Sequence, residues 1–160
     1  MQVLMTNELP MSRTDEVVEH LLKPRLWIPH ADYPDYSLWI DRVHEQLRKE
    51  AKRSMVALEG GRVVGVVLYQ QHRSLSQTLE IKNISVRPEK AGRYIASFLL
   101  RNTEIEGARE YQAQTVTVDA KAGNKGIRLF LLAHRYRITQ EQDLYGLGSG
   151  PDLVFTKVLA

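Results

Sequence analysis

The sequence predicts a mixed α/β fold, and two observations carry this prediction. Apolar runs with the two-residue period of strands alternate along the chain with runs that have the 3.6-residue period of helices. One strand-like run also passes through a short loop with a proline and a glycine directly into an amphipathic helix. With 160 residues and 43% hydrophobic residues, the chain can bury one sizeable core, so we expect a single domain over residues 1–160.

The N-terminal third predicts one strand and two helices. The first strand is expected within residues 1–7. Residues 12–15 resemble a helix start, because hydroxyl and carboxylate side chains accept hydrogen bonds from the first N–H groups of a helix. A loop is expected over residues 30–36, where Pro34 interrupts the apolar period, and a second helix over about residues 37–52.

Three strands are expected next, and the first two form a hairpin. They cover residues 54–58 and 62–69 and flank Gly60 and Gly61. Two glycines between apolar runs predict a tight turn, because such a turn needs positive φ at its central residues.

The third of these strands, over residues 79–86, changes the face of its apolar residues around Lys82 and Asn83. One extra residue in the strand, a β-bulge, would cause this change, and bulges often lie beside functional sites. Burial of both faces of the strand would also explain it, because the side-chain alternation then carries little meaning. The sequence leaves both interpretations open.

The second half of the chain predicts two helices and three strands. A central helix is expected from about Arg93 to Glu106, with Gly107 as its stop, because glycine is common just after a helix. A strand over residues 115–118, a helix over 124–134 and strands over 137–139 and 153–159 complete the chain. The order is therefore strand, two helices, three strands, helix, strand, helix and two strands.

Composition excludes several kinds of chemistry. The chain has no cysteine, so disulfides, thiolate nucleophiles and zinc–thiolate sites are ruled out, and its five histidines lack metal-ligand spacing. We therefore expect no metal site. The start lacks the pattern of a signal peptide and no apolar run could span a bilayer, which favours a cytoplasmic protein without a membrane partner. The net charge of +3 suits an anionic ligand and permits nucleic acid, although a solvated basic surface explains it equally.

The most informative stretch covers residues 84–100, where a strand leads through Pro88 and Gly92 into the central helix. The first N–H groups of a helix have no partner within the helix, and the helix dipole adds partial positive charge there. This arrangement is typical of sites that bind phosphate or pyrophosphate.

The same stretch and a later helix carry a resemblance to a known family. The matching positions are Val86, Pro88, Gly92, Ile95, Ala96, Leu99 and Leu100, followed by Asn124, Phe130 and Tyr136. With the order of elements, they make the chain similar to the GNAT superfamily of acyl-CoA-dependent N-acetyltransferases. The resemblance implies a central, mostly antiparallel sheet of six to seven strands with about four flanking helices.

Four positions depart from the family pattern. Ala91 stands where the phosphate loop has a basic or amide residue, and Tyr94 where it has a glycine. Ile127 replaces an alanine of the later helix. Leu131 replaces the tyrosine that commonly protonates the departing CoA thiolate, so the usual general acid is absent.

The resemblance implies acetyl transfer from acetyl-CoA to a primary amine, and it implies which residues hold the cofactor. Strand backbone would pair with the pantetheine amides, N–H groups of the following loop and helix would hold the pyrophosphate, and an asparagine would contact the cofactor arm. These residues are Ile84, Ser85 and Val86, then Gly92, Arg93, Tyr94, Ile95, Ala96 and Ser97, and finally Asn124. Lys121, Lys125 and Arg128 are candidates for the phosphates, although each also fits an ordinary solvated helix start.

Glu80 is the candidate general base, because some family members use a glutamate at the matching strand position. A partly apolar cleft can raise the pKa of such a carboxyl toward neutrality. An exposed glutamate or a cross-strand salt bridge is the competing interpretation. His134 is a second acid–base candidate or a packed, capping histidine. Tyr145 is a candidate acid or a core residue.

The acceptor stays open between a small amine, a protein amine and aminoacyl-tRNA. An acceptor site would be built from the two N-terminal helices and residues 145–151, and a homodimer is compatible with the resemblance. Two alternatives remain: a CoA-binding or protein-interaction module that has lost catalysis through Tyr94 and Leu131, and a toxin that acetylates aminoacyl-tRNA. A nucleic-acid-binding protein would need a clustered basic face, and Glu50 interrupts the short basic run over residues 48–53.

Overall fold

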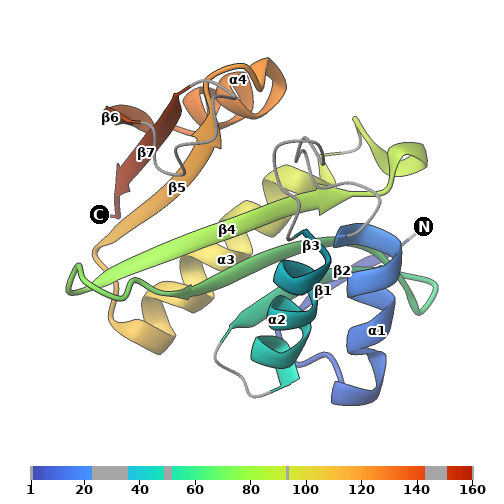
Figure 1. The fold of residues 1–160 in the computed structure, drawn as a ribbon. Helices are drawn as coiled ribbons and strands as arrows, with labels where there is room; N and C mark the ends of the chain where they lie inside the picture. Colours follow the sequence, from blue (N-terminus) through green and yellow to red (C-terminus); the bar gives the residue numbers. More distant parts are fainter. Residues whose placement is uncertain (1, 23–35, 49–51, 93, 143–150, 160) are drawn as a thin grey trace.

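The computed structural model describes residues 2–22, 36–48, 52–92, 94–142 and 151–159, and they form one mixed sheet with helices on both faces (Figure 1). The strands are β1 (Val3–Thr6), β2 (Arg53–Glu59), β3 (Arg62–Gln71), β4 (Thr78–Val86), β5 (Thr115–Lys121), β6 (Arg137–Gln142) and β7 (Asp152–Val158). The α-helices are α1 (Thr14–Val17), α2 (Tyr36–Arg48), α3 (Ile95–Tyr111) and α4 (Lys125–Ala133). Short 3-10 turns cover Met11–Arg13 and Pro88–Lys90, and a π-helical turn, η2 (Val18–Leu22), continues α1.

The seven strands are arranged in the order β1-β2-β3-β4-β5-β7-β6. Only the pair β4 and β5 is parallel, and the other five pairs are antiparallel. The predicted fold class is therefore confirmed. Because β4 and β5 are parallel, a crossover must connect them, and α3 supplies it.

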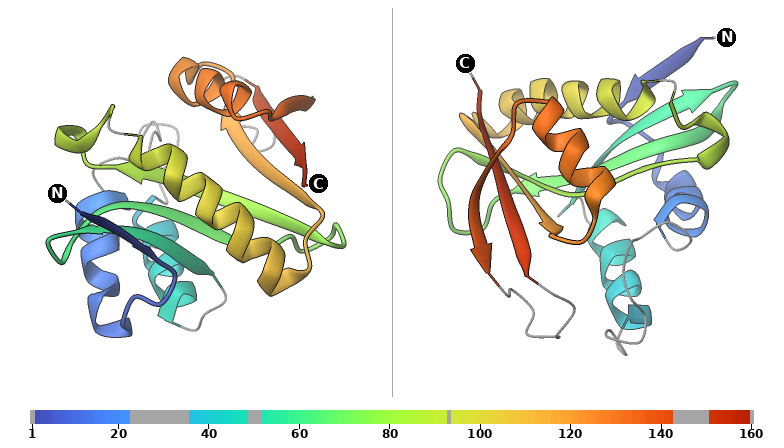
Figure 2. Two further views of the ribbon diagram at one scale, coloured as in Figure 1. Left: turned by 180° about the vertical axis from the view of Figure 1, so that it is seen from behind. Right: turned by 90° about the horizontal axis from the view of Figure 1, so that it is seen from above.

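Each face of the sheet has its own hydrophobic cluster. Helix α3 lies across one face, and α1 and α2 lie across the other (Figure 2). The α3 side buries Tyr69, Leu79, Leu99 and Phe155, all essentially without exposed surface. The cluster on the α1–α2 side joins helix residues such as Leu21 to alternate residues of β2 and β3. Strands β2 and β3 are therefore apolar on both faces, because both faces are covered.

The glycine hairpin and the bulge are both present. Gly60 and Gly61 have φ of +59° and +77°, the backbone that a tight turn between right-twisted strands requires. In the β3–β4 pairing, Leu68 faces Asn83 while the next residue, Tyr69, faces Ile81. Lys82 is the extra residue between these two pairs. The phase change seen in the sequence is thus the bulge.

The predicted end of the central helix was wrong. Gly107 does not end the central helix, which continues to Tyr111 and stops at Gln112, a residue with φ of +51°. Glycine occurs within the helix because Leu79 of β4 packs against it: a Cβ on Gly107 would lie 2.6 Å from Leu79 Cδ2. Helix α2 is described as far as Arg48, and residues 49–51 of its predicted range lie outside the described residues.

The predicted helix start at residues 12–15 lies at the right place, but Arg13 precedes α1 and no side chain caps the helix. The loop expected over residues 30–36 lies largely outside the described residues. None of the described helices is long and apolar enough to cross a membrane.

We predict that Gly107→Ala lowers the free energy of unfolding by about 1–3 kcal/mol, because the new methyl group overpacks a fully buried contact with Leu79. Urea denaturation followed by circular dichroism measures this change. Gly126→Ala is the matched control. It adds the same methyl group in α4, where the nearest atom is 3.9 Å away, and should leave stability unchanged or raise it by up to about 1 kcal/mol. Equal stability of Gly107→Ala and the wild type would contradict the packing argument.

Candidate functional site

The central feature of the site is an opening between two parallel strands. Strands β4 and β5 pair only from Thr78 with Thr115 to Ile81 with Val118. Beyond this point β4 continues to Val86 and β5 to Lys121, but the two strands diverge (Figure 1). Each therefore presents an unpaired edge of backbone N–H and C=O groups to the opening.

The predicted cofactor-binding residues of β4 lie on this edge. Ile84, Ser85 and Val86 pair with β3 on their other side, so β4 remains anchored in the sheet. The hydroxyl of Ser85 donates to the carbonyl oxygen of Leu21 at 3.1 Å. Ser85 is thus fixed by its side chain, and its backbone is the part that remains for a ligand.

The N-terminus of α3 is not capped by the residue before it. The helix begins at Ile95, and the side chain of its N-cap residue, Tyr94, makes no hydrogen bond to the first turn. The N–H groups of Ile95, Ala96 and Ser97 are the first-turn donors that have no partner within the helix. Gly92, with φ of +78°, lies in the loop before them, and Arg93 lies outside the described residues. The geometry required for anion binding is therefore present at the predicted place.

Tyr94 adopts the conformation that a glycine would take. Its φ is +62°, a left-handed backbone that costs a non-glycine residue about 1–2 kcal/mol. The side chain is 74% exposed, so its ring points into solvent. The departure from the family's glycine therefore leaves the backbone of the turn in place and changes its outer surface.

The residue that follows α4, His134, contacts Ser97 at the start of α3. His134 follows the last residue of α4, and its Nε2 lies 3.0 Å from the hydroxyl of Ser97. The imidazole also packs against the ring of Phe130, with 4.6 Å between ring centroids. Asn124 caps α4, since its side-chain oxygen accepts from the N–H of Ile127 at 3.4 Å. Its amide NH₂ remains the part that could contact a cofactor.

The three basic residues proposed for the phosphates differ in their surroundings. Lys121 is buried, with its ammonium 3.1 Å from a carboxylate oxygen of Asp152, so it is an internal ion pair rather than a surface cation. Arg128 donates to the carbonyl oxygen of Ala122 at 2.8 Å. Lys125 is exposed at the start of α4 and is the most accessible of the three.

Glu80 lies on the face of the sheet that α1 and α2 cover, and its side chain is only 14% exposed. It accepts a hydrogen bond from Gln70 Nε2 at 2.7 Å, from the neighbouring position on β3. Lys82 Nζ lies 3.5 Å from Glu80 Oε1, and His72 Nε2 lies 3.9 Å from Glu80 Oε2. Lys82 lies on β4 itself, so this close ion pair is within the strand and is not the cross-strand salt bridge considered from the sequence. The carboxylate is held in place beside the bulge.

Sequence reasoning missed a second carboxyl at the opening, Asp119. It follows Val118, the last residue of β5 that pairs with β4. Burial raises the pKa of Asp119, Glu80 and Asp152 raise it further, and Lys82 and His72 oppose this. The alternation of polar and apolar residues in β5 marks Asp119 as a residue of the polar face, but only the pairing with β4 shows its position beside the opening.

Leu131 is fully buried in the core on the α3 side, so no residue acts as an acid from this position. Tyr136, which matches the family's aromatic position, is also buried and donates to Glu104 at 2.7 Å. Tyr145 lies outside the described residues.

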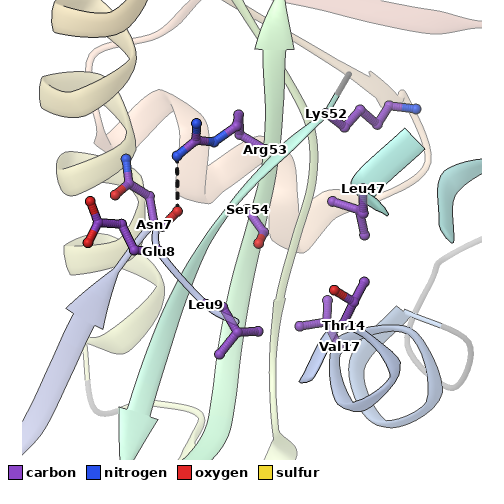
Figure 3. A pocket seen from close by; sticks show the side chains of 9 residues that line it. All are labelled: Asn7, Glu8, Leu9, Thr14, Val17, Leu47, Lys52, Arg53 and Ser54. Carbon is purple, nitrogen blue, oxygen red and sulfur yellow. Dashed lines mark hydrogen bonds between the residues drawn. The ribbon is translucent and has the colours of Figure 1, made fainter. Parts of the chain in front are cut away.

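Two hollows lie away from the opening. One, of about 390 Å³, lies between the end of β1, α1, α2 and the start of β2 (Figure 3). In it Arg53 Nη2 donates to the carbonyl oxygen of Asn7 at 3.1 Å, while the side chain of Lys52 extends in the opposite direction. The other, of about 740 Å³, lies between α3, the end of α4 and β7. Neither is lined by Glu80 or Asp119.

The comparisons with known proteins agree with this architecture. The model of the acetyltransferase (GNAT) family matches residues 15–132, which is most of the chain. No curated protein sequence matches the chain significantly.

Solved structures of the family superpose over almost the whole chain. A GNAT-family protein from Desulfovibrio desulfuricans has a TM-score of 0.81 at 12% identity, with 99% of this chain and 100% of that chain covered. PaiA N-acetyltransferase from Thermoplasma acidophilum, crystallised with coenzyme A, has a TM-score of 0.75 at 14% identity, with 99% and 100% covered. An N-acetyltransferase from Staphylococcus aureus has a TM-score of 0.74 at 16% identity, with both chains fully covered.

The chain therefore belongs to the GNAT family of acetyltransferases, as the sequence motifs indicated. This membership, together with a structural neighbour that holds coenzyme A, supports the expected co-substrate, acetyl-CoA.

The surroundings of Lys52 generate a prediction about pH. Lys52 is buried, and its ammonium donates to Gln46 Oε1 at 2.7 Å. The pKa of Lys52 is lowered from 10.5 to about 8, chiefly by burial and then by the positive charges of Lys82, Arg73 and Arg42, against the opposing effect of Glu80.

Between about pH 8 and 10.5 the unfolded chain binds this proton and the folded chain does not, so stability rises with pH there, by up to about 1.4 kcal/mol per pH unit. We expect Lys52→Met to be more stable than the wild type at pH 7 and to lack this rise. Urea midpoints at pH 7 and pH 9.5 measure both effects. Lys125→Met, at an exposed lysine, is the control and should keep the wild-type pH dependence. A wild-type rise that survives in Lys52→Met would contradict the assignment.

Proposed function

We propose that this protein is an N-acetyltransferase that moves the acetyl group of acetyl-CoA directly to a primary amine. The observation that carries the proposal is the divergence of β4 and β5 next to the uncapped N-terminus of α3. Together they offer an unpaired strand edge for the amides of pantetheine and a set of N–H donors for the pyrophosphate. Asn124 and the exposed Lys125 lie on α4 and are proposed to contact the rest of the cofactor.

The proposed reaction has few steps. The acceptor ammonium must lose a proton before its nitrogen attacks the thioester carbonyl carbon, and the thiolate then leaves. We propose Glu80 as the proton acceptor, because it lies beside the bulge, where the opening begins, and Gln70 and Lys82 fix its carboxylate. A thiolate leaves readily, so close positioning of the two substrates can supply much of the rate acceleration without a dedicated acid.

A second candidate function is a CoA-binding or interaction module without turnover. Leu131 favours it, because a buried leucine stands in the place of the family's usual tyrosine and cannot protonate the leaving thiolate. Calorimetric titration with acetyl-CoA and an assay for CoA release distinguish the two functions. Micromolar binding with release of CoA in the presence of small amines, peptides or aminoacyl-tRNA supports the enzyme. Binding without release for every acceptor supports the module.

We predict that Glu80→Gln lowers kcat for amine acetylation by about 100-fold, because the carboxylate can no longer take the proton. The dissociation constant of acetyl-CoA should change less than about two-fold, because the variant keeps the side-chain volume and leaves the strand edge intact. Initial rates of CoA release and calorimetry measure the two quantities. Glu141→Gln, at an exposed position of β6, is the matched control and should behave as wild type. Wild-type kcat in Glu80→Gln would remove Glu80 from the mechanism.

A further inference from the structure

The side chains of Asn83 and Asp119 face the same side of the sheet as Glu80, at the point where β4 and β5 separate. Glu80 pairs with Thr117, and Asp119 lies two residues further along β5, so Asp119 points to the same side as Glu80. Asn83 pairs with Leu68, a residue of the cluster under α1 and α2, and therefore points to this side too. Asp119 directly follows the last β5 residue that pairs with β4, and Asn83 follows the bulge residue Lys82, whose ammonium reaches Glu80.

Both side chains lack a hydrogen-bond donor among the described residues. The side-chain oxygen of Asn83 is buried and accepts no hydrogen bond from that part of the chain. Asp119 is half-buried and makes no hydrogen bond or close ion pair there either. Buried polar atoms in folded proteins are nearly always satisfied, so the buried oxygen of Asn83 indicates that a donor arrives from outside, and the half-buried carboxylate of Asp119 lies on the same opening.

We propose that Asn83 and Asp119 form the subsite that binds the amino group of the acceptor. This inference rests on the proposed function. The donor that an acetyltransferase must place next to its thioester is an ammonium or amine nitrogen, which carries two or three N–H groups. A carboxylate and an amide oxygen satisfy two of them, and the remaining proton is directed to Glu80. The subsite therefore favours a primary amine, because a tertiary ammonium has one N–H and a secondary ammonium two, and neither could donate to Asn83, Asp119 and Glu80 together.

Asp119 binds an ammonium only in its ionised form, so its charged neighbours matter. Those that act on it are Glu80 and Lys82 on β4, His72 after β3 and Asp152 on β7. Lys121, two residues along β5, is paired with Asp152, so the positive charges that act on the Asp119 carboxyl are those of Lys82 and His72. Burial raises the pKa of Asp119, so amine binding should weaken as the pH falls, in a range above that of an ordinary aspartate.

The first test measures binding without turnover. The full chain is labelled with ¹³C at its aspartates, saturated with coenzyme A, and titrated with n-butylamine while the carboxyl signals are followed by NMR. Asp119→Asn assigns the signal of Asp119. We expect n-butylamine to shift this signal and to lower its titration midpoint, with little effect on the signals of the other aspartates. If tens of millimolar n-butylamine leaves the Asp119 signal unmoved while coenzyme A is bound, the proposal is overturned.

The second test uses kinetics with the best amine of the acceptor panel. Loss of one charge-assisted hydrogen bond should raise KM for the amine roughly 10- to 100-fold in Asp119→Asn, with a smaller rise in Asn83→Leu. In wild type the KM should rise as the pH falls, and Asp119→Asn should lose this dependence. The dissociation constant of acetyl-CoA should stay within about two-fold in both variants, which shows that they fold, and Glu141→Gln is again the control. Unchanged amine KM in both variants overturns the subsite.

The two proposals fail in different ways. If n-butylamine shifts Asp119 but no amine is acetylated, the amine subsite stands and the transferase function falls. If amines are acetylated but Asp119 neither shifts nor affects KM, the transferase stands and the subsite falls.

Discussion

The structure depends on one constraint: two parallel strands pair over four residues each and then separate. Helix α3 holds both halves of the divided sheet. On one side, Leu79 of β4 packs against Gly107. On the other, buried Glu104 accepts from Tyr136 and lies 3.0 Å from the ammonium of Lys157 on β7. Because α3 contacts both halves, packing within the protein holds the opening, and a cofactor that binds there loses less free energy to ordering the protein.

Most of the fold could be predicted from the sequence, because its signals are local. The two glycines of the hairpin predict a turn, and the change of phase at Lys82 indicates a bulge. Each signal lies within a few residues of the feature that it predicts, and the structure confirms both. Gly107 shows where local reasoning fails. A glycine after a helical run usually marks an end, but here it accommodates Leu79, almost thirty positions earlier in the chain. Nothing near Gly107 in the sequence carries that information.

Some parts of the candidate site could likewise be predicted from local sequence, and others could not. The turn proposed to bind phosphate could be located from its residues, since a strand, a proline, a glycine and a helix start are consecutive. The structure adds that Tyr94 takes a left-handed backbone with its ring in solvent, an outcome that a sequence motif cannot specify. Asp119 could not be found, because its relevance comes from the parallel partner strand, and the two strands are separated along the chain by a whole helix. Single carboxylates at strand ends are common, and only their neighbours distinguish them.

The bulge at Lys82 has a consequence for how this chain tolerates changes in length. The residues on either side of Lys82 already pair with consecutive residues of β3, so a chain without it would keep every β3–β4 pair and the same faces of β4. This extra residue stands where the β4–β5 pairing ends, since Ile81 is the last residue of β4 that pairs with β5 and Lys82 follows it. One amino acid beyond what the pairing with β3 uses therefore marks the point at which the sheet stops being continuous.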